Sequence, residues 1–351
     1  MKALSGGWLA SLLRRVLCIR GARRFVLPVL VLAGCLFAGI GRLGAGVGRQ
    51  GAAAASTDES VKLGPGRFVR TLTSGGQERT YVLRLPPSYT GQKPVPLVLL
   101  LHGRGSRGAE VERYSAMGDK ADAEGFILAS PDALGDPPTW NAGLPAGMLG
   151  RADDVGFLHD LIDDLDKRLS LDPDRLYVAG HSSGALMTYR LAGELSPRIA
   201  AIGVVAGSVG VRGPRGRALT IPEPEHPVSV IVFHGTADRL VPYDGGPSAQ
   251  QSVSFLSVAE SVDFWVEHDG CSPEPEREVS KGGTIIKETH AKGKGGSEVV
   301  LYTTVGGNHM WPGMKGSALL SSAKEEISAT ELMWDFFTRH PRAKETPQAG
   351  R

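Results

Sequence analysis

The chain has 351 residues, of which 41% are hydrophobic and 22% are charged, and its formal net charge is +2. This composition is typical of a globular protein, and the length accommodates one large domain with an extension. Because the charges are nearly balanced and no dense basic stripe lies beyond the first two dozen residues, the sequence argues against nucleic acid as a partner. The cysteines, Cys18, Cys35 and Cys271, do not make a disulfide framework or a Cys/His metal site, so we expect no metal and no cofactor.

The start of the chain has the pattern of an export signal. Residues 1–24 are basic, and residues 25–40 form an uncharged apolar run that is shorter than the roughly 20 residues needed to span a bilayer. Two cleavage sites compete. Residues 32–35 (Leu-Ala-Gly-Cys) resemble a lipobox, which would leave Cys35 as an acylated membrane anchor, and residues 53–55 (Ala-Ala-Ala) offer an ordinary signal-peptidase site. The sequence therefore predicts an extracytoplasmic protein, either secreted or lipid-anchored.

The predicted organisation of the chain has four parts. They are a signal peptide or lipoprotein signal at 1–40, a flexible linker at 41–63, a folded domain at 64–340 and a disordered tail at 341–351. The folded domain opens with apolar residues on either side of a Ser-Gly-Gly turn at 74–76, which predicts an antiparallel hairpin.

An uninterrupted apolar run at 97–101 predicts a strand buried on both faces of a parallel sheet. It leads into His102-Gly103-Arg104-Gly105, where the glycines permit close approach of the backbone. A helix is expected at 110–124 and a strand at 126–129. The long loop at 133–150 follows, and we expect its Trp140 to line a pocket.

Asp153 and Asp154 precede an amphipathic helix at 155–169. Paired carboxylates are compatible with a catalytic dyad, but at a helix N-terminus they are explained more simply as caps of the unsatisfied N–H groups. We therefore predict a capping role for this pair.

The strongest motif in the chain is a Gly-x-Ser-x-Gly pattern. A short apolar strand at 176–179 is followed by Gly180-His181-Ser182-Ser183-Gly184 and then by residues with helical spacing. This is the context of a nucleophile elbow, in which only glycine fits two residues on either side of a strained serine. We predict Ser182 as a nucleophile and the N–H of Ser183 as a donor to an oxyanion. The loop after the 97–101 strand supplies the second donor in hydrolases built on such a sheet, and we assign it to Arg104, to within one residue.

The second half of the domain supplies an acid. Strands at 200–206 and 228–233 are separated by an aperiodic segment at 207–227, which is either a lid or a surface loop. Asp238 lies just beyond the second strand, where the acid of a catalytic triad is expected, and Asp244 is the alternative.

A histidine completes the set. A helix at 253–268 and antiparallel strands near 285 and at 299–302 lead to a glycine-flanked loop that contains His309. We predict this residue as general base and acid, with Trp311 beside it in the pocket wall. His102 is also placed at the pocket, where its imidazole is expected to buttress the loop by hydrogen bonding. The chain order Ser182, Asp238, His309 is the order that an α/β-hydrolase sheet uses.

Six motifs share their pattern with a known family, and the resemblance as a whole extends over about residues 79–339. They are His102-Gly103, residues 153–157 (Asp-Asp-Val-Gly-Phe), residues 172–178 (Asp-Pro-Asp-Arg-Leu-Tyr-Val), the Ser182 elbow, residues 234–238 (His-Gly-Thr-Ala-Asp) and residues 307–313 (Gly-Asn-His-Met-Trp-Pro-Gly). The chain resembles the secreted esterases grouped with polyhydroxybutyrate depolymerases, feruloyl esterases and acetylxylan esterases. It departs from them at Arg104, where relatives often carry a small residue, and at Asn308, where glycine is frequent.

The resemblance implies an α/β-hydrolase fold: a mostly parallel central sheet, an antiparallel N-terminal hairpin and helices on both faces. It also implies cofactor-independent ester hydrolysis through an acyl-enzyme, with Ser182, Asp238 and His309 as the catalytic residues. We therefore predict an exported serine esterase for hydroxyalkanoate oligomers or for feruloyl and acetyl esters of plant polysaccharide. The alternatives are a peptidase or thioesterase on the same fold and a non-catalytic surface binding protein.

Overall fold

The computed structural model describes residues 63–143, 152–250, 252–314 and 327–343, all within one compact unit, Glu59–Arg351. The predicted signal at 1–40 and linker residues 41–62 lie outside the described residues, as does the tail from residue 344. Arg342, which belongs to the tail predicted at 341–351, contacts the folded domain. Its backbone N–H donates to the carbonyl oxygen of Asp174 at 2.8 Å, and its guanidinium lies 3.0 Å from the Asp174 carboxylate. Across the described ranges, no helix is both long enough and apolar enough to cross a membrane.

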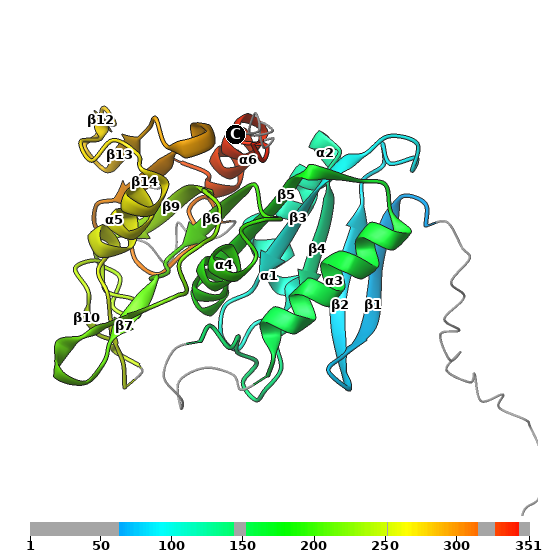
Figure 1. The fold of residues 1–351 in the computed structure, drawn as a ribbon, viewed down its shortest axis with the longest axis horizontal. Helices are drawn as coiled ribbons and strands as arrows, with labels where there is room; N and C mark the ends of the chain where they lie inside the picture. Colours follow the sequence, from blue (N-terminus) through cyan, green and yellow to red (C-terminus); the bar gives the residue numbers. More distant parts are fainter. Residues whose placement is uncertain (1–62, 144–151, 251, 315–326, 344–351) are drawn as a thin grey trace, which may run out of the picture. The chain divides into compact units, whose positions relative to one another are not determined.

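A mixed sheet forms the centre of the fold, with ten strands in the described residues (Figure 1). In spatial order they are β1 (Gly66–Ser74), β2 (Gln77–Leu85), β4 (Ile127–Pro131), β3 (Val95–Leu101), β5 (Leu171–His181), β6 (Ala201–Val205), β9 (Ser229–Gly235), β14 (Val299–Thr304), β13 (Ile285–His290) and β12 (Glu276–Val279). The strands from β4 to β14 run parallel, and an antiparallel pair extends the sheet at each edge. The predicted mostly parallel sheet and its N-terminal hairpin are confirmed.

Helices cover both faces of this sheet, as predicted (Figure 1). One face is covered by α3 (Asp154–Arg168), α4 (Ser183–Glu194) and α5 (Val258–Asp269), and the other by α1 (Gly108–Ser115), α2 (Met117–Glu124) and α6 (Ala329–Arg339). Side chains alternate between the two cores: in β4, Ile127 and Ala129 pack on the α3 side, whereas Leu128 packs on the α1 side. Burial of both faces explains why the central strands are uninterrupted apolar runs.

The single helix predicted at 110–124 is wrong, because the chain forms α1 and α2 with a break between them. Ala116 adopts a left-handed conformation, with φ 58°. The hydroxyl of Ser115 donates to the carbonyl oxygen of Val111 and accepts the N–H of Met117. These local side-chain hydrogen bonds compete with the helical ladder and end the first helix.

The segment at 207–227 contributes two strands, β7 (Gly210–Arg212) and β8 (Ala218–Thr220), to a small second sheet. The other described strands of this sheet come from further along the chain, β10 (Gly246–Pro247) and β11 (Ser254–Phe255), and the spatial order is β10, β11, β7, β8. Val211 and Phe255 of this sheet form an apolar cluster with Leu186 of α4. The segment that the sequence left open as a lid or a loop is therefore packed against the helix that follows Ser182.

Candidate active site

Ser182 lies at the carboxyl end of β5, in the turn that leads into α4. Its backbone has φ 56° and ψ −119°, a conformation that is costly for a residue with a side chain. The turn is tight, because a Cβ added to Gly180 would overlap the carbonyl oxygen of Gly184, and one added to Gly184 would overlap that of Leu101. Close backbone contacts therefore require both glycines of the motif, and the serine is left partly exposed at the edge of the sheet.

His309 and Asp238 come from the ends of two other strands and meet Ser182 at this edge. His309 follows β14, and its Nε2 lies 2.8 Å from Oγ of Ser182. Asp238 follows β9, and its Oδ2 lies 2.6 Å from Nδ1 of His309. Because a carboxylate only accepts hydrogen bonds, Nδ1 carries the ring hydrogen, and Nε2 is free to accept from the serine hydroxyl. The alternative acid, Asp244, is exposed, and the His309 ring bonds to Asp238 instead.

The Asp238 carboxylate is buried and accepts three N–H groups from described residues. Oδ1 accepts from the backbone N–H groups of Leu240 and Val241, at 2.8 and 3.0 Å. Oδ2 accepts from His309. Nε2 of His234, whose hydrogen is donated to the carbonyl oxygen of Val241 at 2.8 Å, lies 3.3 Å from Oδ2. Burial alone would raise the pKa of this carboxyl, but its interactions with His234 and His309 outweigh burial and lower the pKa below its ordinary value. Asp238 therefore stays ionised and orients the His309 ring.

Two candidate oxyanion donors belong to residues that adjoin Ser182, one along the chain and one in the neighbouring loop. Ser183 is the first residue of α4, so its N–H has no acceptor within the helix. Gly103, in the loop after β3, approaches so closely that a Cβ on it would lie 3.4 Å from Cβ of Ser182, and Arg104 follows it directly. Neither the N–H of Ser183 nor that of Arg104 donates a hydrogen bond to another residue that the structure describes. These two amides are the candidates to bind an oxyanion at Ser182.

No family model matches the chain. Among curated proteins, one named "Putative esterase NocK", from Nocardia uniformis subsp. tsuyamanensis, is 30% identical over 287 residues, which cover 76% of this chain and 81% of that protein. The chain belongs to the esterases of the α/β-hydrolase type. Feruloyl esterase B from Piromyces equi is 28% identical to this esterase over 236 residues, which cover 66% of this chain and 42% of that relative.

A solved structure agrees with this assignment. The acetyl xylan esterase from Aspergillus awamori has a TM-score of 0.53 and covers 77% of this esterase and 99% of its own chain. At 13% sequence identity this likeness shows the shared fold alone. The sequence relatives place the protein among the carboxylic ester hydrolases.

The prediction that Trp140, Trp311 and His102 line the substrate pocket of the esterase is wrong, because all three side chains are fully buried. Trp140 packs on His102 with the ring centroids 5.2 Å apart, and its Nε1–H donates to the His102 carbonyl oxygen at 2.9 Å. His102 donates from Nδ1 to the Gly103 carbonyl oxygen and accepts at Nε2 from the N–H of Ala133. Burial lowers the pKa of His102, which keeps it neutral for this role. These residues support the loops of the site from the core, as the predicted buttressing by His102 requires.

Asp153 and Asp154 have different roles at the start of α3. Asp153 accepts the N–H of Gly156 at 2.9 Å, so its predicted capping role is confirmed. Asp154 is fully buried, forms an ion pair with Arg79 at 2.6 Å and accepts the N–H of Asn141. The capping prediction is wrong for Asp154, whose carboxylate ties the loop after β4 to β2.

Two histidines next to the motif residues received no role from the sequence. His181 precedes Ser182, and its Nε2 lies 3.3 Å from the carbonyl oxygen of His309. His234 reaches Asp238 and also contacts the carbonyl oxygen of Val241 at 2.8 Å. The only signal available was their position inside the two motifs. In the described part of the esterase, no group of three or more His, Cys, Asp or Glu side chains is arranged to hold a metal ion.

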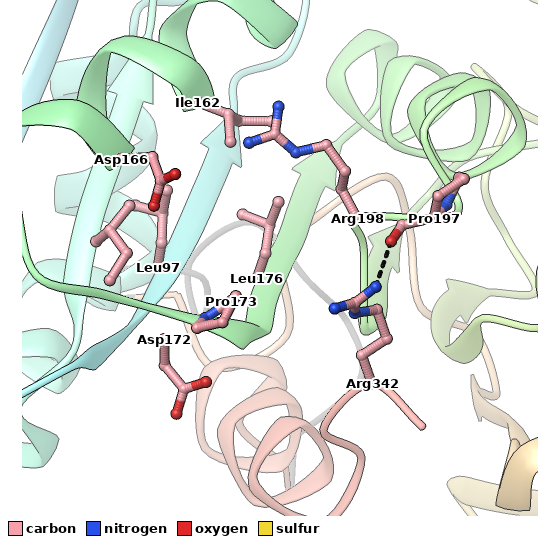
Figure 2. Close-up of a pocket in the computed structure, with 10 residues that line it drawn as sticks. Leu97, Ile162, Asp166, Asp172, Pro173, Leu176, Pro197, Arg198 and Arg342 are labelled. Atoms are coloured by element: carbon pink, nitrogen blue, oxygen red, sulfur yellow. Dashed lines mark hydrogen bonds between the residues drawn. The ribbon is translucent and has the colours of Figure 1, made fainter. Parts of the chain in front are cut away.

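A cavity of about 150 Å³ lies away from all of these groups (Figure 2). It is found where β3 and β5 begin, and Figure 2 shows Leu97 and Asp166 together on one side, Arg198 and Arg342 on the other, and Leu176 between them. Ser182 stands at the opposite end of β5. This cavity is therefore separate from the candidate active site.

Proposed function

We propose that this esterase works through an acyl-enzyme on Ser182, with His309 as general base and then general acid, and with Asp238 orienting His309. Oγ attacks the ester carbonyl carbon while its proton moves to Nε2 of His309, and the alcohol leaves with that proton. A water molecule then attacks the acyl carbon and gives a proton to Nε2. The carboxylic acid leaves as Ser182 recovers its hydrogen.

The observation that supports this mechanism is the pair of hydrogen bonds that links the three side chains. Oγ of Ser182 lies 2.8 Å from Nε2 of His309, and Nδ1 lies 2.6 Å from Asp238. The amides of Ser183 and Arg104 are proposed to bind the oxyanion of each tetrahedral intermediate. Such donors act strongly because they are fixed before the charge develops.

For the substrate we propose feruloyl or acetyl esters of plant polysaccharide. The names of the relatives, feruloyl esterase and acetyl xylan esterase, support this class. The sequence resemblance to polyhydroxybutyrate depolymerases favours hydroxyalkanoate oligomers as the alternative. Purified protein should be tested on feruloyl sugars, acetylated xylan and hydroxybutyrate oligomers without added metal. Release of ferulate or acetate is expected. If only the hydroxybutyrate oligomers are hydrolysed, the substrate class is hydroxyalkanoate oligomers instead.

We also propose that the protein is exported. The support is the basic segment at 1–24 followed by the apolar run at 25–40. The mass of the mature N-terminus distinguishes the two predicted cleavage sites. A chain that begins at a diacylated Cys35 and an unmodified chain that starts after residue 55 differ in both length and lipid content. Recovery of the full-length chain from the cytoplasm would contradict export.

The serine mechanism has a direct test. Ser182→Ala should lower kcat on a short acyl aryl ester by about 10⁴-fold or more, because no nucleophile remains to form the acyl-enzyme. Ser130→Ala is the matched control, since Ser130 is a buried serine whose hydroxyl has no partner among the described residues. A fluorophosphonate should add its mass to Ser182 in the parent protein.

The same experiments separate the alternatives. Faster turnover of amides or thioesters than of oxygen esters would indicate a peptidase or a thioesterase. Absence of the fluorophosphonate adduct, with full activity retained in Ser182→Ala, would rule out the serine mechanism. Absence of both adduct and activity would favour a binding protein.

A further inference from the structure

His181 connects helix α1 to the loop that carries His309, and the mechanism proposed above does not use it. Its Nδ1 lies 2.9 Å from the hydroxyl oxygen of Tyr114 in α1, and its Nε2 lies 3.3 Å from the backbone carbonyl oxygen of His309. Its ring also packs against the rings of His309 and Trp311, with centroid separations of 5.3 and 6.2 Å. No other histidine that the structure describes contacts the His309 backbone in this way.

The hydrogen-bond partners of His181 determine its tautomer. The carbonyl oxygen of His309 only accepts, so Nε2 of His181 must carry the hydrogen and donate it. Nδ1 is then a bare acceptor, and the hydroxyl of Tyr114 donates to it. Burial raises the pKa of Tyr114 well above its ordinary value, so this hydroxyl keeps its hydrogen.

The same surroundings keep His181 neutral. Burial, and after it the charge of His309, lower the pKa of His181 to about 3. This matters because His309 becomes positively charged when it takes a proton from Ser182, and a second cation at this distance would oppose that step. His181 thus contacts the base without competing for its charge.

We propose that His181 is a positioning residue: by donating Nε2–H to the carbonyl oxygen of His309, it holds the His309 ring within reach of Ser182 and adds no charge beside it. The inference rests on the proposed function, because it takes His309 as the general base. This carbonyl group belongs to His309 itself, so a shift of the carbonyl group also displaces the imidazole ring. Tyr114 acts one step further out, by holding the tautomer of His181.

Two substitutions of His181 test the hydrogen bond. His181→Phe keeps a ring in the same packing position and removes both hydrogen bonds. Because a displacement of about 1 Å at a reacting group costs on the order of 100-fold, kcat should fall by about 100-fold while KM stays within about twofold. His181→Gln restores an N–H donor and should recover most of this loss. A residue that served only to stabilise the fold would not produce this difference between kcat and KM.

A tyrosine pair provides a milder test with a matched control. Tyr114→Phe removes only the hydroxyl that donates to His181, and we expect kcat to fall by about fivefold through partial loss of the correct tautomer. Tyr177→Phe is the control, because Tyr177 is also buried but its hydroxyl has no partner among the described residues. Its kcat should equal that of the parent. If His181→Phe fails to fold, as judged by circular dichroism and thermal melting, the comparison of these two variants decides the question.

The rate of fluorophosphonate labelling at Ser182 separates this inference from the proposed function. Slower labelling of folded His181→Phe, in proportion to its kcat, would support the positioning role. Parent-like labelling and kcat in that variant would overturn the inference and leave the serine mechanism intact. If the parent protein itself is not labelled, the proposed function fails and the inference fails with it.

Discussion

Replacement of Asp238 by asparagine should inactivate the esterase through the tautomer of His309. Oδ1 of Asp238 accepts the N–H groups of Leu240 and Val241, so the carbonyl oxygen of an asparagine must occupy that place, because an NH₂ group cannot accept there. The NH₂ group then faces Nδ1 of His309, where Oδ2 lies at 2.6 Å in the parent protein. Nδ1 is forced to accept, the ring hydrogen moves to Nε2, and His309 can no longer take the proton from Ser182.

The expected loss in kcat is about 10⁴-fold, which corresponds to about 5.5 kcal/mol of transition-state stabilisation. KM should change little, because the substitution leaves the substrate-binding surface unaltered. Steady-state hydrolysis of a short acyl p-nitrophenyl ester measures both constants. Asp244→Asn is the matched control, since this exposed carboxylate on the same loop should not affect the rate. The reasoning is refuted if Asp238→Asn keeps more than about a tenth of the parent kcat, or if Asp244→Asn shows the larger loss.

Three further predictions concern stability. Gly180→Ala places a methyl group against the backbone at the start of α4, so it should lower the free energy of unfolding in urea by about 1–3 kcal/mol. Gly64→Ala is the control, because its methyl group meets open space and should change this free energy very little. Equal urea midpoints for the two variants would contradict the steric argument. Arg79→Met leaves Asp154 buried without its cation, so the free energy of unfolding should fall by about 3–5 kcal/mol. Adding Asp154→Leu should recover most of this loss. If Arg79→Met alone is as stable as the parent protein, the ion pair does not stabilise the fold. The pKa of Asp238 is lower in the folded state, so its carboxylate stabilises the fold above about pH 4, and this contribution is lost as the pH falls further. Asp238→Asn lacks the contribution at every pH. Between about pH 5 and pH 2, its melting temperature should therefore fall less than that of the parent protein.

The elbow could be predicted because its constraints are local. The strand, the turn and the helix follow one another in the chain. Gly180 is required by a backbone contact within the turn, and Gly184 by a backbone contact with β3, the neighbouring strand of the sheet. The parallel sheet was predictable for a related reason, since strands such as β3 are apolar at nearly every position. His309 and Asp238 were singled out because each follows an apolar strand, and the carboxyl ends of parallel strands share one edge of the sheet.

The pocket residues and the second carboxylate could not be predicted in the same way. Trp140 was expected to face a pocket because it lies in a long loop, but the structure buries it on His102. Asp154 was expected to cap a helix, but its partner Arg79 comes from a strand 75 residues earlier. A pattern of apolar and polar residues indicates whether a position is buried, and it does not indicate which distant group fills the space beside it.

Apart from the break between α1 and α2, the sequence by itself determined the local elements named above, the order of the reactive side chains along the chain and the edge of the sheet to which they belong. These features depend on backbone geometry and on hydrophobic periodicity, which are written in neighbouring residues. Only the tertiary structure decided which groups touch: the three donors to Asp238 with His234 beside them, the buttress behind the loop of Arg104, and the bridge from Tyr114 through His181 to His309. Hydrogen bonds and buried charges act over a few ångströms in space, whatever the separation along the chain, so their partners become known only when the chain is folded.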